Sequence, residues 1–284
     1  NIPVDPSIST GLRHAAEATL KQYPKLTAEN LAISVVDLTN PATVARGDFN
    51  GDARFYPASV IKLFFMADVY HQRKESWGDA DRALKEMIVV SDNDATAFLV
   101  DILTDTCSGS RLSGRALRRF IEKRKKVNRY FESMNYDVSA MMKPWSFGPF
   151  GRDVQALGEN RVYRNRATAN GTASLLLWIV RGRAVSSAAS KAMMDLMERP
   201  LAPQRKDENQ VKDFIGEALP TGTRLWSKAG WTSEVRHDAA YLEFPGGKKI
   251  VLVIYTRGVA GDTTLLPAIT RNVMAEFGWA PAAE

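Results

Sequence analysis

The apolar positions of this chain change their spacing twice. Strand-like alternation marks both ends of the sequence, and helical spacing marks the middle. The predicted strands are Leu31–Leu38, a segment around Thr43–Gly47, Arg224–Lys228, Asp238–Phe244 and Lys249–Tyr255. The predicted helices are Thr10–Gln22, Val60–Tyr70, Ala80–Val90, Ala95–Leu103, Leu112–Phe131, Gly171–Arg181, Ser186–Met197 and Leu265–Phe277.

This order of elements predicts an α/β (α+β) fold. Strands at both ends can complete one antiparallel sheet flanked by helices, and the helical middle then forms an inserted all-α domain. The predicted sheet domain is discontinuous and covers residues 1–58 and 209–284, while the all-α domain covers 59–208. We expect the active site in the cleft between these domains.

Composition and charge narrow the class of protein. The 284 residues are 45% hydrophobic, and no apolar run is long enough to predict a membrane span. The single cysteine, Cys107, rules out an internal disulfide and is compatible with an oxidising compartment. The chain begins at Asn1, which a removed export signal or a shortened chain would explain. We expect a periplasmic or secreted protein.

Much of the net charge of +6 comes from one short segment of the chain. Nine Lys or Arg residues and one acid, Glu122, lie between Arg111 and Arg129 among apolar residues at helical spacing. This pattern favours an amphipathic helix with a solvated basic face, and contact with a polyanion is the alternative. No nucleic-acid motif accompanies these charges, so we expect no nucleic-acid partner.

The first candidate for chemistry is Ser59, which stands at the entrance of an apolar helix. Lys62 follows three residues later and therefore lies on the same helical face. A serine hydroxyl needs a base to become a nucleophile, and a lysine with a lowered pKa can take its proton. Backbone amides at the helix start can stabilise an oxyanion. A capping serine beside a solvated lysine is the alternative interpretation.

Two further motifs accompany this pair. Ser91-Asp92-Asn93 stands between two predicted helices, where it could also be a simple helix cap. Lys228-Ala229-Gly230 follows a predicted strand, where it could also be a turn. Together with Ser59 and Lys62 they form an ordered set. This set resembles the S-x-x-K, S-D-N and K-T-G motifs of class A β-lactamases and penicillin-binding proteins.

The resemblance implies a role for each matching residue. Ser59 would be acylated, Lys62 and Ser91 would move its proton, and the amides of Ser59 and Trp231 would form the oxyanion hole. The residues predicted to bind substrate are Asn93, Lys228, Gly230, Trp231, Thr232 and Arg236. Arg236 is included because a guanidinium can bind a substrate carboxylate bidentately, and Thr232 because it could replace a missing hydroxyl. No cofactor and no metal are expected. Arg164–Thr168 also resembles the segment that closes the Ω loop of this family.

The sequence also departs from the family pattern. Ser59 and Ser91 are closer together than in class A enzymes, and Ala229 replaces the hydroxyl residue of K-T-G. No glutamate stands where class A enzymes place the deacylating base, so only Asp153 and Glu159 remain as weak candidates. The leading hypothesis is a monomeric, class A-like serine β-lactamase. A cell-wall-type peptidase or esterase and a penicillin-binding sensor without turnover are the alternatives.

Overall fold

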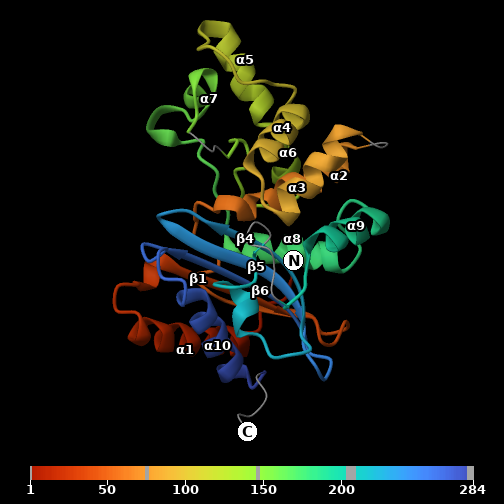
Figure 1. Cartoon of the computed structure of the whole chain (residues 1–284). Helices are drawn as coiled ribbons and strands as arrows, with labels where there is room; N and C mark the ends of the chain where they lie inside the picture. Colours follow the sequence, from red (N-terminus) through yellow and green to blue (C-terminus); the bar gives the residue numbers. More distant parts are fainter. Residues whose placement is uncertain (1, 74–76, 145–147, 203–208, 280–284) are drawn as a thin grey trace. The chain divides into compact units, whose positions relative to one another are not determined.

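The computed structural model describes residues 2–73, 77–144, 148–202 and 209–279 (Figure 1). It divides the chain into two compact units. Unit 1 contains Asn1–Val60 and Thr168–Glu284, and unit 2 contains Ile61–Ala167.

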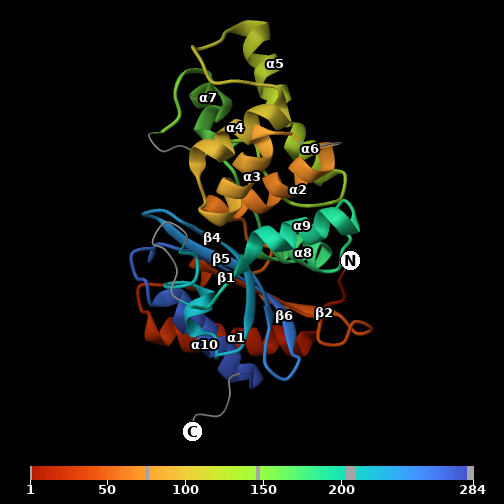
Figure 2. The same ribbon diagram turned by 45° about the vertical axis from the view of Figure 1, so that its right-hand side comes forward.

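Unit 1 is built on a six-stranded antiparallel sheet with the order β2-β1-β6-β5-β4-β3 (Figures 1 and 2). The strands are β1 (Leu31–Asp37), β2 (Ala45–Phe49), β3 (Glu198–Arg199), β4 (Arg224–Trp231), β5 (Val235–Glu243) and β6 (Lys249–Arg257). Strand β1 pairs with β6 along its whole length, so the two ends of the chain meet inside one sheet. This confirms the predicted fold class.

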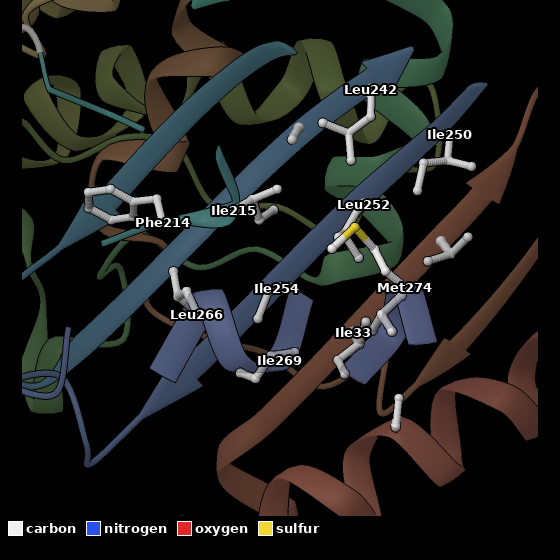
Figure 3. Close-up of a cluster of buried hydrophobic side chains, with 14 of the residues drawn as sticks. Ile33, Phe214, Ile215, Leu242, Ile250, Leu252, Ile254, Leu266, Ile269 and Met274 are labelled. Carbon is white, nitrogen blue, oxygen red and sulfur yellow. The ribbon is translucent and has the colours of Figure 1, made fainter. Parts of the chain in front are cut away.

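Helices cover both faces of this sheet. Helices α1 (Pro6–Gln22) and α10 (Leu265–Phe277) pack on one face, and their apolar residues join those of the strands in a buried cluster (Figure 3). Ile33, Leu252 and Ile254 belong to this cluster because alternate strand residues point to the same side. Helices α8 (Ala169–Val180) and α9 (Ser187–Met197) cover the other face (Figure 2).

Unit 2 contains helices α2 (Lys62–Gln72), α3 (Asp79–Val89), α4 (Asn93–Thr104), α5 (Gly114–Arg124), α6 (Lys126–Glu132) and α7 (Gly151–Ala156). The 3₁₀ helix η3 (Glu159–Arg161) also belongs to it.

Three further 3₁₀ helices complete the elements: η1 (Ala28–Asn30), η2 (Ala58–Ile61) and η4 (Ile215–Ala218). Of these, η2 runs directly into α2. Within the described ranges, no helix is both long and apolar enough to cross a membrane.

Three of the differences from the sequence predictions concern the domain boundary, the basic segment and the Lys228 motif. Residues 168–202 pack with the sheet of unit 1, whereas the predicted helical domain ran to residue 208, which lies outside the described residues. The basic segment predicted as one helix is divided into α5 and α6 at Lys125. Strand β4 continues to Trp231, so the Lys228-Ala229-Gly230 motif lies inside a strand and not in a turn.

Candidate active site

Ser59 lies in η2 and its side chain is partly exposed. The residue before it, Ala58, has a φ angle of 46°, a left-handed conformation that is uncommon for a residue with a Cβ. Such strained positions occur often at functional sites and persist only where the surrounding structure holds them. The backbone that presents Ser59 is therefore held in an unfavourable conformation by its neighbours.

Gly230 of β4 lies directly against this backbone. A Cβ atom at position 230 would come within 2.8 Å of the amide nitrogens of both Ser59 and Val60. Any larger residue would push the strand away from Ser59. This close approach explains the glycine, and it brings the backbone of β4 next to the backbone of Ser59 within unit 1.

Lys228 is completely buried in β4. Its Nζ donates to the backbone oxygen of Ala229 at 2.8 Å and to Oε1 of Gln210 at 2.6 Å. The same oxygen of Gln210 accepts a hydrogen bond from the amide of Ala229 at 3.0 Å. Sequence reasoning missed Gln210, because nothing in its local pattern indicates a contact with a strand 18 residues away.

Arg236, a predicted partner of the substrate carboxylate, lies in β5. It pairs with Trp231 across the β4–β5 ladder, whereas Lys228 pairs with Ala239, so the two side chains point to opposite faces of the sheet. The guanidinium is buried and donates from Nε to the backbone oxygen of Ala260 at 3.0 Å. The structure therefore gives no support to Arg236 as a partner of the substrate carboxylate on the Lys228 face.

The two other predicted residues of this hairpin have different surroundings. The Trp231 side chain is 47% exposed, and its ring centroid lies 5.5 Å from that of Phe214. Thr232 lies beyond the end of β4, and its hydroxyl accepts hydrogen bonds from the amides of Glu234 and Val235 at 3.1 Å and 3.3 Å. The Thr232 hydroxyl thus has a structural partner in the turn.

Lys62 is the centre of a second group of residues, which lies in unit 2. Its Nζ donates to Oδ1 of Asn93 at 2.8 Å, to the backbone oxygen of Ser91 at 2.6 Å and to the hydroxyl of Ser91 at 3.1 Å. The lysine side chain is fully buried, and burial lowers its pKa to about 7, although the charge of Asp92 acts in the opposite direction. Near neutral pH a large fraction of Lys62 is therefore uncharged and able to accept a proton.

The Ser91-Asp92-Asn93 motif both caps a helix and contacts Lys62. The Asp92 carboxylate accepts from the amide of Ala95 at 2.6 Å and caps α4, as the simple interpretation of the motif expected. Ser91 has a φ angle of 61°, and this left-handed backbone accompanies the contacts of both its carbonyl and its hydroxyl with Lys62. The cap and the lysine contacts exist together.

A family model described as the beta-lactamase enzyme family matches residues 79–277, which is more than half of the chain. The chain belongs to the beta-lactamase enzyme family. The match includes the Ser91 and Lys228 motifs and begins after Ser59 and Lys62. A search of curated proteins found no match.

Solved structures that are similar to this chain share its fold. A beta-lactamase from Sphaerobacter thermophilus is 20% identical, with a TM-score of 0.68 over 95% of this chain and 98% of its own. PBP-A is 17% identical, with a TM-score of 0.67 over 99% and 100% of the two chains. TLA-3 extended-spectrum beta-lactamase is 13% identical, with a TM-score of 0.67 over 95% and 98%. At these identities the likeness establishes the fold and not the substrate.

In this member of the beta-lactamase family, neither Asp153 nor Glu159 has surroundings that suit a hydrolytic base. Asp153 is buried in α7 and accepts a hydrogen bond from Nη2 of Arg124 at 2.7 Å, in an ion pair where both side chains are 1% exposed. Glu159 is exposed in η3. Asp153 therefore belongs to a structural ion pair, and Glu159 lies at the surface.

The segment that resembles the end of the Ω loop is anchored by its second residue. Oδ1 of Asn165 accepts from the amides of Met141 and Met142 at 3.0 Å and 2.8 Å, and Nδ2 donates to the Met142 oxygen at 2.8 Å. This buried amide fixes the path of residues 141–142 within unit 2. Across the described parts of the chain, no group of three or more His, Cys, Asp or Glu side chains could hold a metal ion.

Proposed function

We propose that this protein is a serine hydrolase that forms an acyl-enzyme on Ser59, with β-lactam amides as its substrate class. The observation that carries the proposal is the surroundings of Lys62: a buried amine with a pKa of about 7, bonded to Ser91 and Asn93. Ser59 lies three residues before Lys62, in the 3₁₀ segment that runs directly into α2. A lysine of this kind suits a base that activates a serine.

In the proposed reaction, uncharged Lys62 takes the proton of the Ser59 hydroxyl while Oγ attacks the carbonyl carbon of the substrate. The carbonyl oxygen becomes an oxyanion, which the backbone amides of Ser59 and Trp231 stabilise. The C–N bond then breaks, and the nitrogen receives a proton from Lys62 through the Ser91 hydroxyl, which lies 3.1 Å from Nζ. Lys228 attracts an anionic group of the substrate by its charge.

A second outcome of the same site is acylation without turnover. Release of the acyl group needs a base for the attacking water, and the ion pair with Arg124 makes Asp153 unsuitable. A mutant of PBP-A, 18% identical with a TM-score of 0.66, was solved as an acyl-enzyme complex with penicillin G. This favours a long-lived penicillin adduct, as in a penicillin-binding peptidase, an esterase or a sensor. We further propose that the protein acts in the periplasm or after secretion, as a monomer.

Intact-protein mass spectrometry after mixing with benzylpenicillin tests both outcomes. We expect a covalent adduct on the natural protein and none on Ser59→Ala, with the adduct lasting far longer than in a fast β-lactamase. A nitrocefin assay in parallel measures turnover. If Ser59→Ala is labelled as fully as the natural protein, Ser59 is not the nucleophile.

A further inference from the structure

His237 of β5 connects the sheet of unit 1 to the segment just before Ser59. Its ring is completely buried. Nδ1 accepts a hydrogen bond from the amide of Thr256 at 3.0 Å, and Nε2 lies 2.8 Å from the backbone oxygen of Tyr56. Because Nδ1 must accept from an amide, the proton of the neutral ring is on Nε2, which donates to the Tyr56 carbonyl. Burial lowers the pKa of His237 to about 4, so the ring is neutral at pH 7.

The cross-strand partner of His237 contacts the same segment. His237 pairs directly with Gly230, which approaches the amides of Ser59 and Val60 so closely that a Cβ would come within 2.8 Å of them. One pair of residues on the β4–β5 ladder thus reaches the Ser59 segment at two points. Gly230 permits the close approach, and His237 binds the carbonyl three residues upstream of Ser59.

The segment between these two points needs such support. Ala58 has a φ angle of 46°, and this left-handed conformation is strained for a residue that has a Cβ. Aromatic rings fix the orientation of the histidine. The ring of Phe55 meets it edge-on at 6.2 Å, and the ring of Tyr255 lies 4.6 Å away with its hydroxyl bonded to Thr172 at 2.8 Å.

We propose that His237 is a positioning residue for Ser59. Its bond to Tyr56 holds the strained segment in the conformation that presents the serine hydroxyl and the Ser59 amide against β4. The role rests on the proposed function of Ser59 as a nucleophile. It differs from a general packing role, because it depends on one donor atom, Nε2, and not on the volume of the ring.

Two substitutions separate these roles. His237→Gln can place an amide donor near the position of Nε2 and keep the bond to Tyr56, while it loses the acceptor for Thr256. His237→Asn can keep an acceptor near the position of Nδ1 for Thr256, while it is too short to reach Tyr56. Both variants lose the aromatic ring and should have a lower Tm, so each serves as the stability control for the other.

The rate of acylation by benzylpenicillin and hydrogen exchange of the peptide covering residues 55–61 are measured for both variants. We expect His237→Asn to acylate roughly 10- to 100-fold more slowly than His237→Gln, with an unchanged dissociation constant for the initial complex and faster exchange in this peptide. Equal acylation rates together with equal exchange would overturn the proposal. If the natural protein is not acylated, the proposed function of Ser59 fails, and the exchange difference alone then decides whether His237 anchors the segment.

Discussion

Two of the buried cations in unit 2, Lys62 and Arg124, have different hydrogen-bond acceptors. Lys62 donates to a carbonyl oxygen, a hydroxyl and an amide oxygen, all of which are neutral. Arg124, which is 1% exposed, donates to the carboxylates of Asp101 at 3.2 Å and Asp153 at 2.7 Å. Burial penalises both charges, but only Arg124 has carboxylates in direct contact that compensate for it.

This difference separates a candidate base from a structural ion pair. Lys143 extends the Arg124 group, because it also contacts the Asp101 carboxylate and donates to the Ser108 hydroxyl at 2.9 Å. Neutral acceptors fix Lys62 in place without stabilising its charge to the same degree, so its pKa is lowered to about 7. The kind of acceptor around a buried cation therefore indicates whether it can exchange a proton near neutral pH.

Removing the amine of Lys62 should have the largest effect. We expect Lys62→Met to slow acylation of Ser59 about 10²- to 10⁴-fold, the usual contribution of a general base, with little loss of stability because a buried charge is also removed. Stopped-flow measurement of benzylpenicillin acylation checks this. A variant that keeps more than a tenth of the natural rate would show that another group takes the proton.

Breaking the ion pair of Arg124 should affect stability instead. We expect Asp153→Ala to lower the free energy of unfolding by about 3–5 kcal/mol, because it leaves the Arg124 charge buried with less compensation. Urea unfolding measures this, and the double variant Arg124→Met, Asp153→Leu is the control that should regain part of the loss. The acylation and deacylation rates of the folded fraction should not change. A selective loss of deacylation would instead identify Asp153 as the hydrolytic base.

Giving Lys62 an acidic neighbour, as Arg124 has, tests directly whether the kind of acceptor sets its pKa. In the natural protein the rate of acylation should rise as the pH passes through about 7, because the uncharged amine is the base. Asn93→Asp places a carboxylate where Oδ1 lies 2.8 Å from Nζ, which raises the pKa of Lys62 and lowers the rate at pH 7 about tenfold. The rate should recover at higher pH, whereas Asn93→Ala, which adds no charge, should show no such shift.

The same substitution should change how stability depends on pH. The pKa of Lys62 falls from 10.5 to about 7 on burial, so between these values the unfolded chain binds more protons than the folded one. This contribution makes stability rise with pH from about 7 to 10.5. Asn93→Asp should reduce the slope in that window, which thermal unfolding across the pH range can measure.

The smallest effect is expected at Lys228. Its side-chain hydrogen-bond acceptor is neutral, like those of Lys62. Gln210→Glu can keep both contacts to Lys228 and Ala229 while it adds a negative charge beside the ammonium. We expect KM for an anionic β-lactam to rise about three- to tenfold, with little change for a neutral ester. Gln210→Leu, which removes the contacts without adding charge, is the matched control. Equal effects on both substrates would mean that Lys228 does not recognise the anion by charge.

The sequence predicted the parts of the site that depend on local spacing and motif order. Lys62, Ser91 and Asn93 come from two of the predicted motifs and are in contact, while their catalytic and binding roles stay predictions. Helix α10 was predicted with the bounds that the structure shows. The contact of Gln210 with Lys228 could not be predicted, because it depends on the path of a loop that has no periodic pattern.

The differences between the sequence predictions and the structure have physical causes. The side of the sheet on which Arg236 lies depends on the length of the β4–β5 turn, since each added residue reverses the side-chain direction. Helix α8 is apolar on most of its surface, with eight of its twelve residues buried, so its sequence fits a helical bundle as well as a sheet face. Its assignment to unit 1 depends on tertiary packing that periodicity does not encode.

The pairing of β1 with β6 affects how the protein can be synthesised. Asp37 pairs with Ile250 and Leu31 with Thr256, so β1 leaves the ribosome more than 200 residues before its partner. At about 5–20 residues per second, the nascent chain carries β1 without that neighbour for roughly 10–40 s. The whole of unit 2 is made during this interval. The sheet can therefore close only near the end of translation or after it, and until then the unpaired edge of β1 is open to a chaperone or to the edge of another nascent chain.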